Sequence, residues 1–283
     1  MDYHKESFED HSFLFSDEKG KLIALLPANL KDHNLVSHGG LTYGGFIINN
    51  QMSTSLMIDL FKETILHLKL KSIKKFIYKT IPSIYHKIPS EEDRYALFIE
   101  KAKLIRRDVL SVINCKNQIE YQKRRLRGIK KAKKNDLDVH RVYNFKSFWD
   151  ILESVLLKFH NNSPTHSLKE IEYLSEKFPE NIKLFGCSRN DILVAGVIIY
   201  ESEKVAHAQY IASNDEGRQY GALDMIFDFL IKTYYKDSIF FDFGISNENE
   251  GLYLNRGLIE NKEGYGARAI VHDYYQIDIK WEN

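Results

Sequence analysis

The chain has 283 residues, a formal net charge of +1, 43% apolar residues and 28% charged residues. This length suffices for one large domain or two small ones with a sizeable core. The near balance of charge argues against a strong global field for nucleic acid. The most apolar run, Ile192 to Tyr200, is far too short to span a bilayer. The polar N-terminus, Met1 to Glu6, lacks the apolar run of a signal peptide, so we expect a cytoplasmic protein.

Cys115 and Cys187 are the only cysteines. They show neither metal-ligand spacing nor a disulfide framework, so we expect two buried thiols in a reducing compartment. A catalytic cysteine is the alternative. His38 has no cysteine or acidic residue at metal-ligand spacing, and we predict no metal site.

The first part of the chain predicts a strand, a polar loop, a helix and a second strand. The first strand covers residues 41–48 and the loop covers residues 49–53. Apolar residues at helical spacing between 56 and 64 indicate one buried helix face. Residues 72–81 read as the next strand.

A glycine-rich run, Ser37 to Gly45, stands at the start of this unit. So many glycines beside His38 and Tyr43 indicate backbone exposed in a cleft. We assign His38, Thr42 and Tyr43 to the binding of an acceptor substrate. The alternative is a glycine-rich turn that binds no ligand.

A basic segment, Gln122 to Lys134, follows. Leu126, Ile129 and Ala132 fall on one helical face, which favours a solvated helix that connects two lobes. A nucleic-acid contact or a basic wall beside an anionic substrate are the alternatives. Interleaved aromatic residues are missing, so stacking on a single strand is not indicated.

The second half begins with two amphipathic helices, at 145–159 and 167–178, and the second has a predicted capping box of Ser167 with Glu170. Three short β-runs bounded by turn residues then predict a meander. Its strands are Asn181 to Cys187, Ile192 to Tyr200 and Val205 to Ile211.

A polar loop at 212–221, a helix at 223–234 and a strand at 238–244 come next. The first turn of a helix leaves backbone N–H groups without partners and favours an anion. Gly217 and Gly221 allow close backbone approach, and Arg218 adds a positive charge. The strand, loop, helix and strand repeat the order of the first half, which indicates two similar lobes. A chance similarity of α/β units is the alternative.

These segments resemble the GNAT acyltransferase fold. The loop Asp215 to Ala222 is similar to the family's phosphate loop, usually Gln/Arg-x-x-Gly-x-Gly/Ala, at Arg218 and Gly221, whereas Leu223 departs from it. The segment Tyr253 to Leu258 is similar to the family's Tyr-x-x-x-Gly-Phe element, with leucine in place of phenylalanine.

The doubled plan resembles more narrowly the Fem-type (FemABX) transferases, over nearly the whole chain. Arg124 to Lys134 is similar to their R-x-x-I-x-K-A-x-K element. Phe241 to Gly244 resembles Tyr-Asp-Phe-Gly, and Asn261 to Gly266 resembles Phe-Lys-x-Gly-Phe-Gly with Asn261 replacing the aromatic residue. The resemblance implies an α/β (α+β) fold of two GNAT-like lobes, each a mixed central sheet flanked by helices. We expect an acceptor lobe at 1–140, ending in the basic helix, and a donor lobe at 141–283.

The resemblance further implies a GNAT-like N-acetyltransferase of the kind found with surface-polysaccharide biosynthesis. Its expected reaction is direct transfer of an acyl group, such as acetyl, from acyl-CoA (acetyl-CoA) to the amine of a nucleotide-linked amino sugar. One alternative is a Fem-type enzyme that uses aminoacyl-tRNA, with the helix at 122–134 as the RNA contact. Another is a non-catalytic module that binds a glycan or a nucleotide. In the leading hypothesis the partner is a small molecule, with no metal and no membrane span.

For the donor, we place the acyl chain along Gln209, Tyr210 and Ile211, where backbone N–H groups can polarise the carbonyl. The diphosphate would lie on the amides that follow. The predicted cofactor contacts are therefore Gln209, Tyr210, Ile211, Gly217, Arg218, Gly221 and Ala222.

For the chemistry, Asp242 at the end of an apolar strand is the candidate that orients or deprotonates the amine, and His207 is a second candidate base. A cap and a core histidine are their structural alternatives. The resemblance implies that Tyr253 protonates the leaving thiolate. Lys262 would hold an acceptor phosphate or stabilise the oxyanion. The remaining substrate contacts are predicted at Tyr265 and Arg268.

Overall fold

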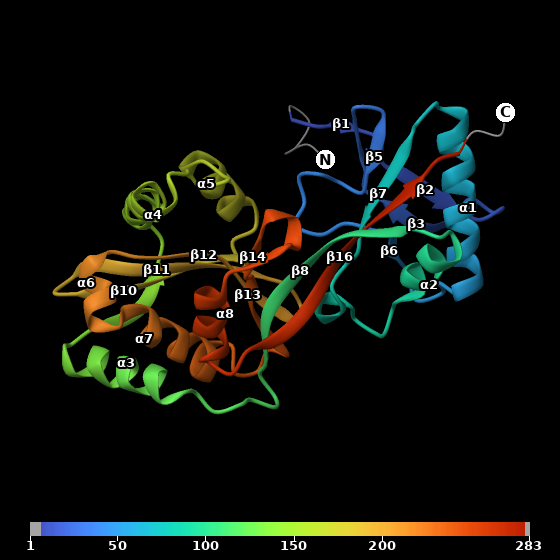
Figure 1. Ribbon diagram of the computed structural model, residues 1–283. Helices are drawn as coiled ribbons and strands as arrows, with labels where there is room; N and C mark the ends of the chain where they lie inside the picture. Colours follow the sequence, from blue (N-terminus) through green and yellow to red (C-terminus); the bar gives the residue numbers. More distant parts are fainter. Residues whose placement is uncertain (1–6, 281–283) are drawn as a thin grey trace. The chain divides into compact units, whose positions relative to one another are not determined.

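A computed structural model describes residues 7–280 of the chain (Figure 1), and the polar segment of residues 1–6 lies outside this range. The chain forms two compact units. Unit 1 comprises Met1–Val109, Asn247–Tyr253 and Ile270–Asn283, and unit 2 comprises Leu110–Ser246 and Leu254–Ala269.

The observed division differs from the predicted one, because the boundary expected at residue 140 falls inside unit 2. The basic helix α3 (Lys123–Lys134) packs on α7 (Ala222–Phe229), and β9 (Asp138–Val142) pairs with β10 (Ile182–Arg189), so both belong with the C-terminal elements. Two long strands, β8 (Lys103–Asn114) and β16 (Arg268–Asp278), each run from one unit into the other.

Unit 1 is built on a mixed sheet. Its strands follow the order β1-β4-β5-β7-β16, in which β5 and β7 are parallel and β7 and β16 antiparallel. A second, three-stranded sheet has the order β2-β3-β6. The strand bounds are β1 (Glu9–Asp10), β2 (Phe13–Ser16), β3 (Leu22–Leu26), β4 (Asn29–Lys31), β5 (Asn34–Val36), β6 (Ile47–Ile48), β7 (Lys75–Lys79) and β14 (Asn247–Glu248).

Two helices cover this unit, α1 (Thr54–Leu70) and α2 (Glu92–Ile99). The side chain of Ser53 caps α1 by accepting from the amide of Leu56. The buried face of α1 is the predicted one and consists of Met57, Leu60, Phe61, Thr64 and Leu68. The prediction of a strand over 41–48 is wrong for all but Ile47 and Ile48, because the backbone before them forms a loop held by other contacts.

Unit 2 has a second mixed sheet, ordered β8-β13-β12-β11-β10-β9, in which only β12 and β13 are parallel. The bounds are β11 (Ile192–Glu201), β12 (Val205–Ser213) and β13 (Phe240–Ile245). The predicted meander is confirmed within two residues at each end. Asn190 and Asp191 have φ of 49° and 62°, as expected for a two-residue hairpin turn of type I′.

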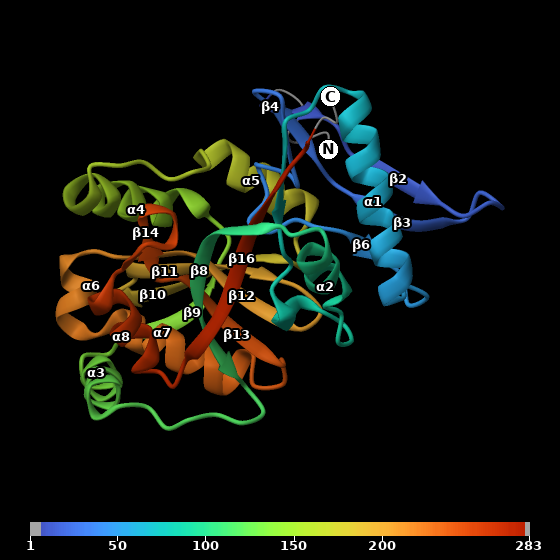
Figure 2. The same cartoon turned by 45° about the vertical axis from the view of Figure 1, so that its right-hand side comes forward.

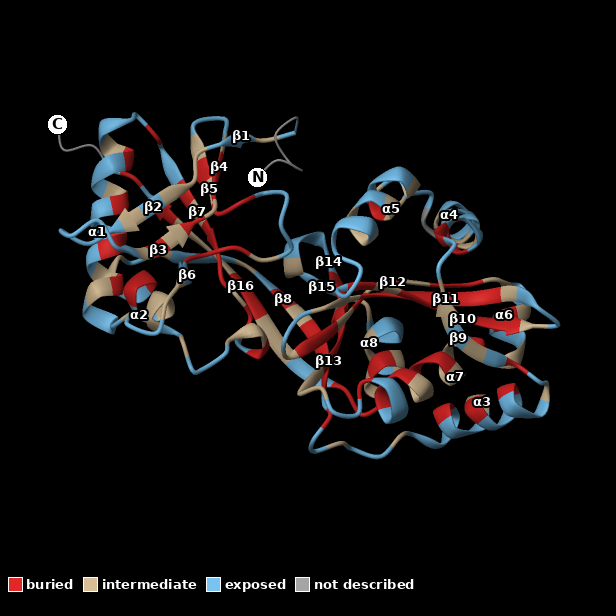
Figure 3. Ribbon diagram, turned by 180° about the vertical axis from the view of Figure 1, so that it is seen from behind, coloured by how far each residue is buried: buried red, intermediate tan, exposed pale blue. Residues whose placement is uncertain are grey.

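Helices cover both faces of this sheet (Figures 1 and 2), and its central strands are buried between them (Figure 3). On one face Val197 and Ile199 pack with Ile226 of α7. On the other, Ile198 packs with Trp149. The remaining helices are α4 (Phe145–His160), α5 (Leu168–Lys177), α6 (Asp215–Tyr220) and α8 (Arg256–Glu263).

Local predictions in unit 2 have two outcomes. The capping box of Ser167 and Glu170 is confirmed, whereas the polar loop at 212–221 is wrong. There, β12 continues to Ser213 and the short helix α6 starts at Asp215, because the Asn214 side chain caps it through the amide of Gly217.

The basic helix α3 is confirmed, but its inner face is shifted by one residue. Ile129 and Ala132 are buried with Arg125, whereas Leu126 is exposed. The Arg125 guanidinium lies 2.6 Å from an oxygen of Asp224 on α7 and donates to the Tyr265 hydroxyl at 3.2 Å. This buried polar contact replaces the apolar one that the pattern predicted.

Cys115 and Cys187 are buried and unbridged, as predicted. Burial raises the pKa of the Cys115 thiol to about 11 and that of Cys187 to about 12, so both thiols are protonated at neutral pH. Within residues 7–280, none of the helices is long and apolar enough to cross a membrane.

Candidate active site

The parallel strands β12 and β13 part at the centre of unit 2. In the described part of the chain, their pairing covers Val205–His207 and Phe240–Asp242. β12 continues along β11 to Ser213, while Ile245 of β13 pairs with Leu110 of β8. The last matched pair before the strands part is therefore His207 with Asp242.

A β-bulge lies just beyond this point. Ala208 faces Ile199 and Tyr210 faces Ile198, so Gln209 is the extra residue of β12. A bulge leaves its extra residue outside the regular ladder. The backbone of Gln209, where the sequence predicts contact with the acyl group, is thus the irregular point of the strand.

His207 and Asp242 form a direct contact across the two strands. The imidazole Nδ1 lies 2.8 Å from Asp242 Oδ2, and Asp242 Oδ1 accepts from the amide of Gly244 at 2.8 Å. Asp242 is 1% exposed. Gly244 has φ of 72°, and a Cβ there would come within 3.3 Å of His207 Cε1, so glycine allows this tight turn beside the ring.

Lys262 on α8 reaches the same turn. Its ammonium donates to the carbonyls of Gly244 at 3.1 Å and Ile245 at 2.6 Å. The side chain is buried, and burial lowers the pKa of Lys262 to about 8, against an opposing effect of the Asp242 charge. Three residues chosen from the sequence as catalytic, His207, Asp242 and Lys262, therefore meet at one turn.

Other predicted residues lie elsewhere. Tyr253 is in unit 1 and exposed, and its role as an acid stays a prediction. Tyr265 is 1% exposed, and its hydroxyl donates to Asp224, which places it in the core. Arg268 is exposed at the start of β16 and donates to the carbonyl of Ala267.

Of the predicted phosphate-binding residues, Gly217 and Arg218 lie within α6, Gly221 is its C-cap and Ala222 starts α7. Close packing explains why positions 217 and 221 are both glycine. A Cβ at Gly217 would lie 2.4 Å from the Val194 carbonyl oxygen, and a Cβ at Gly221 would lie 2.7 Å from the Gly128 carbonyl oxygen. Ala222 is buried in the core, and the Tyr210 side chain packs edge-on against Trp149. Ile211 is partly buried on β12.

A pocket of about 260 Å³ lies beside α6, and its charged walls include Lys158, Asp215 and Arg218. Asp215 accepts from Lys158 at 2.9 Å and lies 3.4 Å from Arg218. Both cations thus share one carboxylate, which is largely exposed. A phosphate here would have to take the place of Asp215, and the diphosphate site stays a prediction.

The glycine-rich run of unit 1 is organised by a lysine that the sequence analysis missed. The Lys79 ammonium donates to the carbonyls of His38, Gly39 and Leu41 at 3.0, 3.4 and 2.6 Å. Its position at the end of an apolar strand, like that of Asp242, was the available signal. His38 is fully buried with φ of 49°.

The other two residues assigned to the acceptor lie further along this run. Thr42 is exposed, and the ring of Tyr43 packs 4.5 Å from that of Tyr85. Across residues 7–280, no group of three or more histidine, cysteine or acidic side chains could hold a metal ion.

No protein-family model and no curated protein sequence matches the chain. Solved structures do. FemX superimposes with a TM-score of 0.67 at 11% identity, over 96% of this chain and 89% of that one. The C-terminal domain of a putative lysylphosphatidylglycerol synthetase from Agrobacterium fabrum gives 0.65 at 9%, over 94% and 84%. A tandem GNAT protein from the clavulanic acid biosynthesis pathway gives 0.50 at 6%, over 99% and 87%. The chain therefore has a tandem GNAT-like fold shared with FemX, which confirms the predicted fold class.

Proposed function

We propose that the protein is an acyltransferase whose reaction occurs in unit 2. The single observation that carries this proposal is the His207–Asp242 contact where β12 and β13 part, next to the bulge at Gln209. Acyl transfer to an amine needs a base that takes a proton from the amine and hydrogen-bond donors that face the carbonyl. A histidine held by a carboxylate can be the base, and the irregular backbone at the bulge can face the carbonyl. The fold shared with FemX and a tandem GNAT protein supports the same class.

Each of these residues has a separate role in the proposed reaction. Asp242 fixes the imidazole through Nδ1, so that Nε2 of His207 takes the proton from the attacking amine. The amine nitrogen bonds to the thioester carbonyl carbon, the carbon–sulfur bond breaks, and the leaving thiolate takes up the proton that His207 received. An ammonium has three donors. Lys262 uses two on Gly244 and Ile245, and its third stabilises the developing oxyanion.

The finer assignment is an acetyl group from acetyl-CoA transferred to a nucleotide-linked amino sugar, with the backbone of Gln209 facing the acyl carbonyl and Arg218 near the diphosphate. Purified protein mixed with acetyl-CoA and a panel of nucleotide amino sugars should release free thiol. Calorimetry should show CoA binding. No thiol release with any acceptor, together with no CoA binding, would refute the assignment.

The rate of acyl transfer is expected to fall as pH rises through about 8. The pKa of Lys262 is lowered to about 8, so its stabilising ammonium is present below that pH and lost above it. A Lys262→Arg variant keeps its charge at every pH used, and its falling limb should move to higher pH. Rates measured from pH 6.5 to 9.5 test this, and a profile that is the same in both proteins contradicts it.

The charge of α3 favours a second candidate, an enzyme that takes its acyl group from aminoacyl-tRNA. The helix carries no acidic residue. Lys123, Arg124, Arg127, Lys130, Lys131 and Lys134 are exposed and, among the residues described, none has a carboxylate within 4 Å. Such a row of unpaired cations fits a phosphate backbone.

If tRNA is the donor, replacing Lys123, Arg127, Lys130 and Lys134 by glutamine should weaken tRNA binding. The slope of log K against log salt should fall by about one for each lost phosphate contact. Filter binding between 50 and 200 mM salt measures the slope. A Lys169→Gln, Lys177→Gln variant of the exposed lysines of α5 is the control. An unchanged slope in the α3 variant rules this candidate out.

A further inference from the structure

Unit 1 contains a cavity of about 250 Å³ that no sequence pattern indicated. It lies where the segment leading into α1, the connection after β7 and the first turn of α2 come together. Phe46, Met52, Met57 and Ile81 give it apolar walls, and Asp93 and Glu92 contribute carboxylates. Pockets for drug-sized ligands begin at about 300 Å³, so this cavity suits a smaller molecule.

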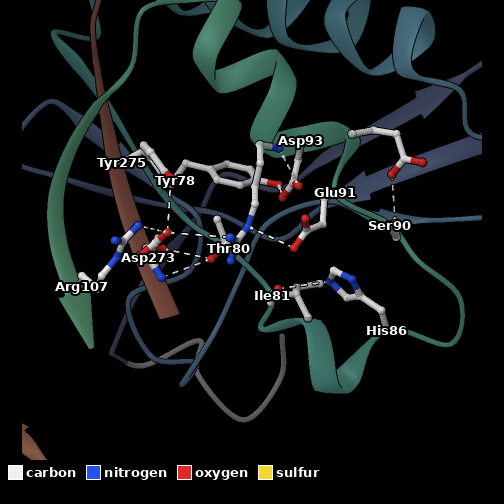
Figure 4. Close-up of polar contacts among 12 residues, drawn as sticks. Tyr78, Thr80, Ile81, His86, Ser90, Glu91, Asp93, Arg107, Asp273 and Tyr275 are labelled. Atoms are coloured by element: carbon white, nitrogen blue, oxygen red, sulfur yellow. Dashed lines mark hydrogen bonds and ion pairs between the residues drawn. The ribbon is translucent and has the colours of Figure 1, made fainter. Parts of the chain in front are cut away.

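Asp93 is the unusual group of this cavity, and Figure 4 shows its side chain in contact with Tyr78. One of its oxygens accepts from the Tyr78 hydroxyl at 2.9 Å, and the other from the amide of Arg94 at 2.8 Å. Within the described residues, no lysine or arginine nitrogen lies within 4 Å of it. The Arg94 guanidinium lies instead 3.8 Å from Glu91 and 3.9 Å from Asp273.

Burial raises the pKa of Asp93, because its charge is poorly solvated, and this effect outweighs the opposing effects of the hydrogen bonds from Tyr78 and Arg94 and of the His86 and Arg94 charges. The ring Nε2 of His86 lies 3.1 Å from the carbonyl of Ile81, Glu92 adds a second negative charge, and Lys87 is exposed at the rim. The cavity therefore combines apolar walls, an excess of negative charge and a buried carboxylate that a cation would stabilise.

We infer that this cavity binds a small organic ammonium ion, with its charged head on Asp93 and its aliphatic chain between Met52 and Met57. Charge-assisted hydrogen bonds from an ammonium to a carboxylate are stronger than neutral ones. The rings of Phe46 and Tyr85 in the wall favour a cation further. A neutral molecule of equal size would gain only the apolar contact. Binding here is independent of acyl transfer and is measured with no acyl donor present.

The four methionines make a direct test possible. Met52 and Met57 line the cavity, whereas Met225 lies on α7 in unit 2 and serves as an internal control. In protein labelled with 13C at the methionine methyl groups, titration with n-butylammonium should shift the Met52 and Met57 signals to saturation and leave Met225 unchanged. 1-Butanol, the neutral counterpart, should bind at least about tenfold more weakly.

An Asp93→Asn variant keeps an oxygen that can accept from Tyr78 but loses the charge. It should bind n-butylammonium at least about tenfold more weakly than the wild type, whereas Asp237→Asn, a change at an exposed position of unit 2, should not alter binding. Equal affinity for the amine and the alcohol, or no shift at Met52 and Met57, overturns the inference. The comparison of amine with alcohol in the wild type decides the matter even if the variant fails to fold.

Discussion

A His207→Gln variant is expected to transfer acyl groups about 10² to 10⁴ times more slowly than the wild type. Glutamine fills a similar space but cannot take up the proton of the attacking amine. Asp242 would keep its contact with the amide of Gly244, so we expect the fold to be preserved. Thiol release in the presence of acetyl-CoA and an accepted amine measures the rate, and circular dichroism checks the fold.

The chain offers a matched control for this experiment. His140 on β9 also contacts an aspartate, since its Nδ1 lies 3.2 Å from Asp138 Oδ2, but both side chains are well exposed. His140→Gln should therefore leave the rate within about twofold of the wild type, as surface changes usually have small effects. A His207→Gln rate as high as that of His140→Gln would remove His207 from the reaction.

An Asp242→Asn variant tests whether Asp242 acts by orienting the His207 ring or through its negative charge. The asparagine oxygen can still accept from Gly244 or contact the ring, but it cannot stabilise an imidazolium. We expect a loss of about 10²-fold or more in kcat. A kcat equal to that of the wild type would show that the charge of Asp242 is not needed for the reaction.

The strands of the meander were predictable because their signals are local. Short β-runs bounded by turn residues define β10 and β11, and the Asn190–Asp191 turn fixes their register. The same holds for α5, whose first turn is set by Ser167 and Glu170. Such elements need little information from distant parts of the chain.

Elements that depend on distant contacts could not be predicted in this way. The segment at 41–48 reads as a strand, but Lys79, later in the sequence, donates to the carbonyls of His38, Gly39 and Leu41 at and before its start. The buried face of α3 includes Arg125 only because Asp224 lies opposite, 99 residues away. Periodicity alone cannot distinguish a buried arginine from an exposed one.

Some features of the candidate active site could be predicted from the sequence, and others could not. Asp242 and His207 were recognisable as polar residues on apolar strands, but their pairing follows from the parallel register of β12 and β13. The bulge at Gln209 depends on the partner strand as well. The cavity of unit 1 gave no signal, because its walls come from segments around residues 50 and 90 that are unremarkable when taken separately.

The largest effect on stability is expected from Arg125→Met. Arg125 is buried with Asp224, and its guanidinium also lies 4.9 Å from the centre of the Tyr265 ring. Methionine fills much of the space but leaves the Asp224 carboxylate with only the Tyr265 hydroxyl as a donor from this cluster. Removing one partner of a buried ion pair costs about 3–5 kcal/mol, because the remaining charge is uncompensated. Urea unfolding measures the loss.

Arg127→Met is the control for this change, because it makes the same substitution on the exposed face of the same helix. Its effect should stay within about 0.5 kcal/mol. Adding Asp224→Asn to Arg125→Met removes the stranded charge, so the double variant should be more stable than Arg125→Met alone, as two coupled neighbours are not additive. If Arg125→Met costs no more than Arg127→Met, the contact between α3 and α7 does not depend on this pair, and packing of Ile129 and Ala132 must hold the helix in place.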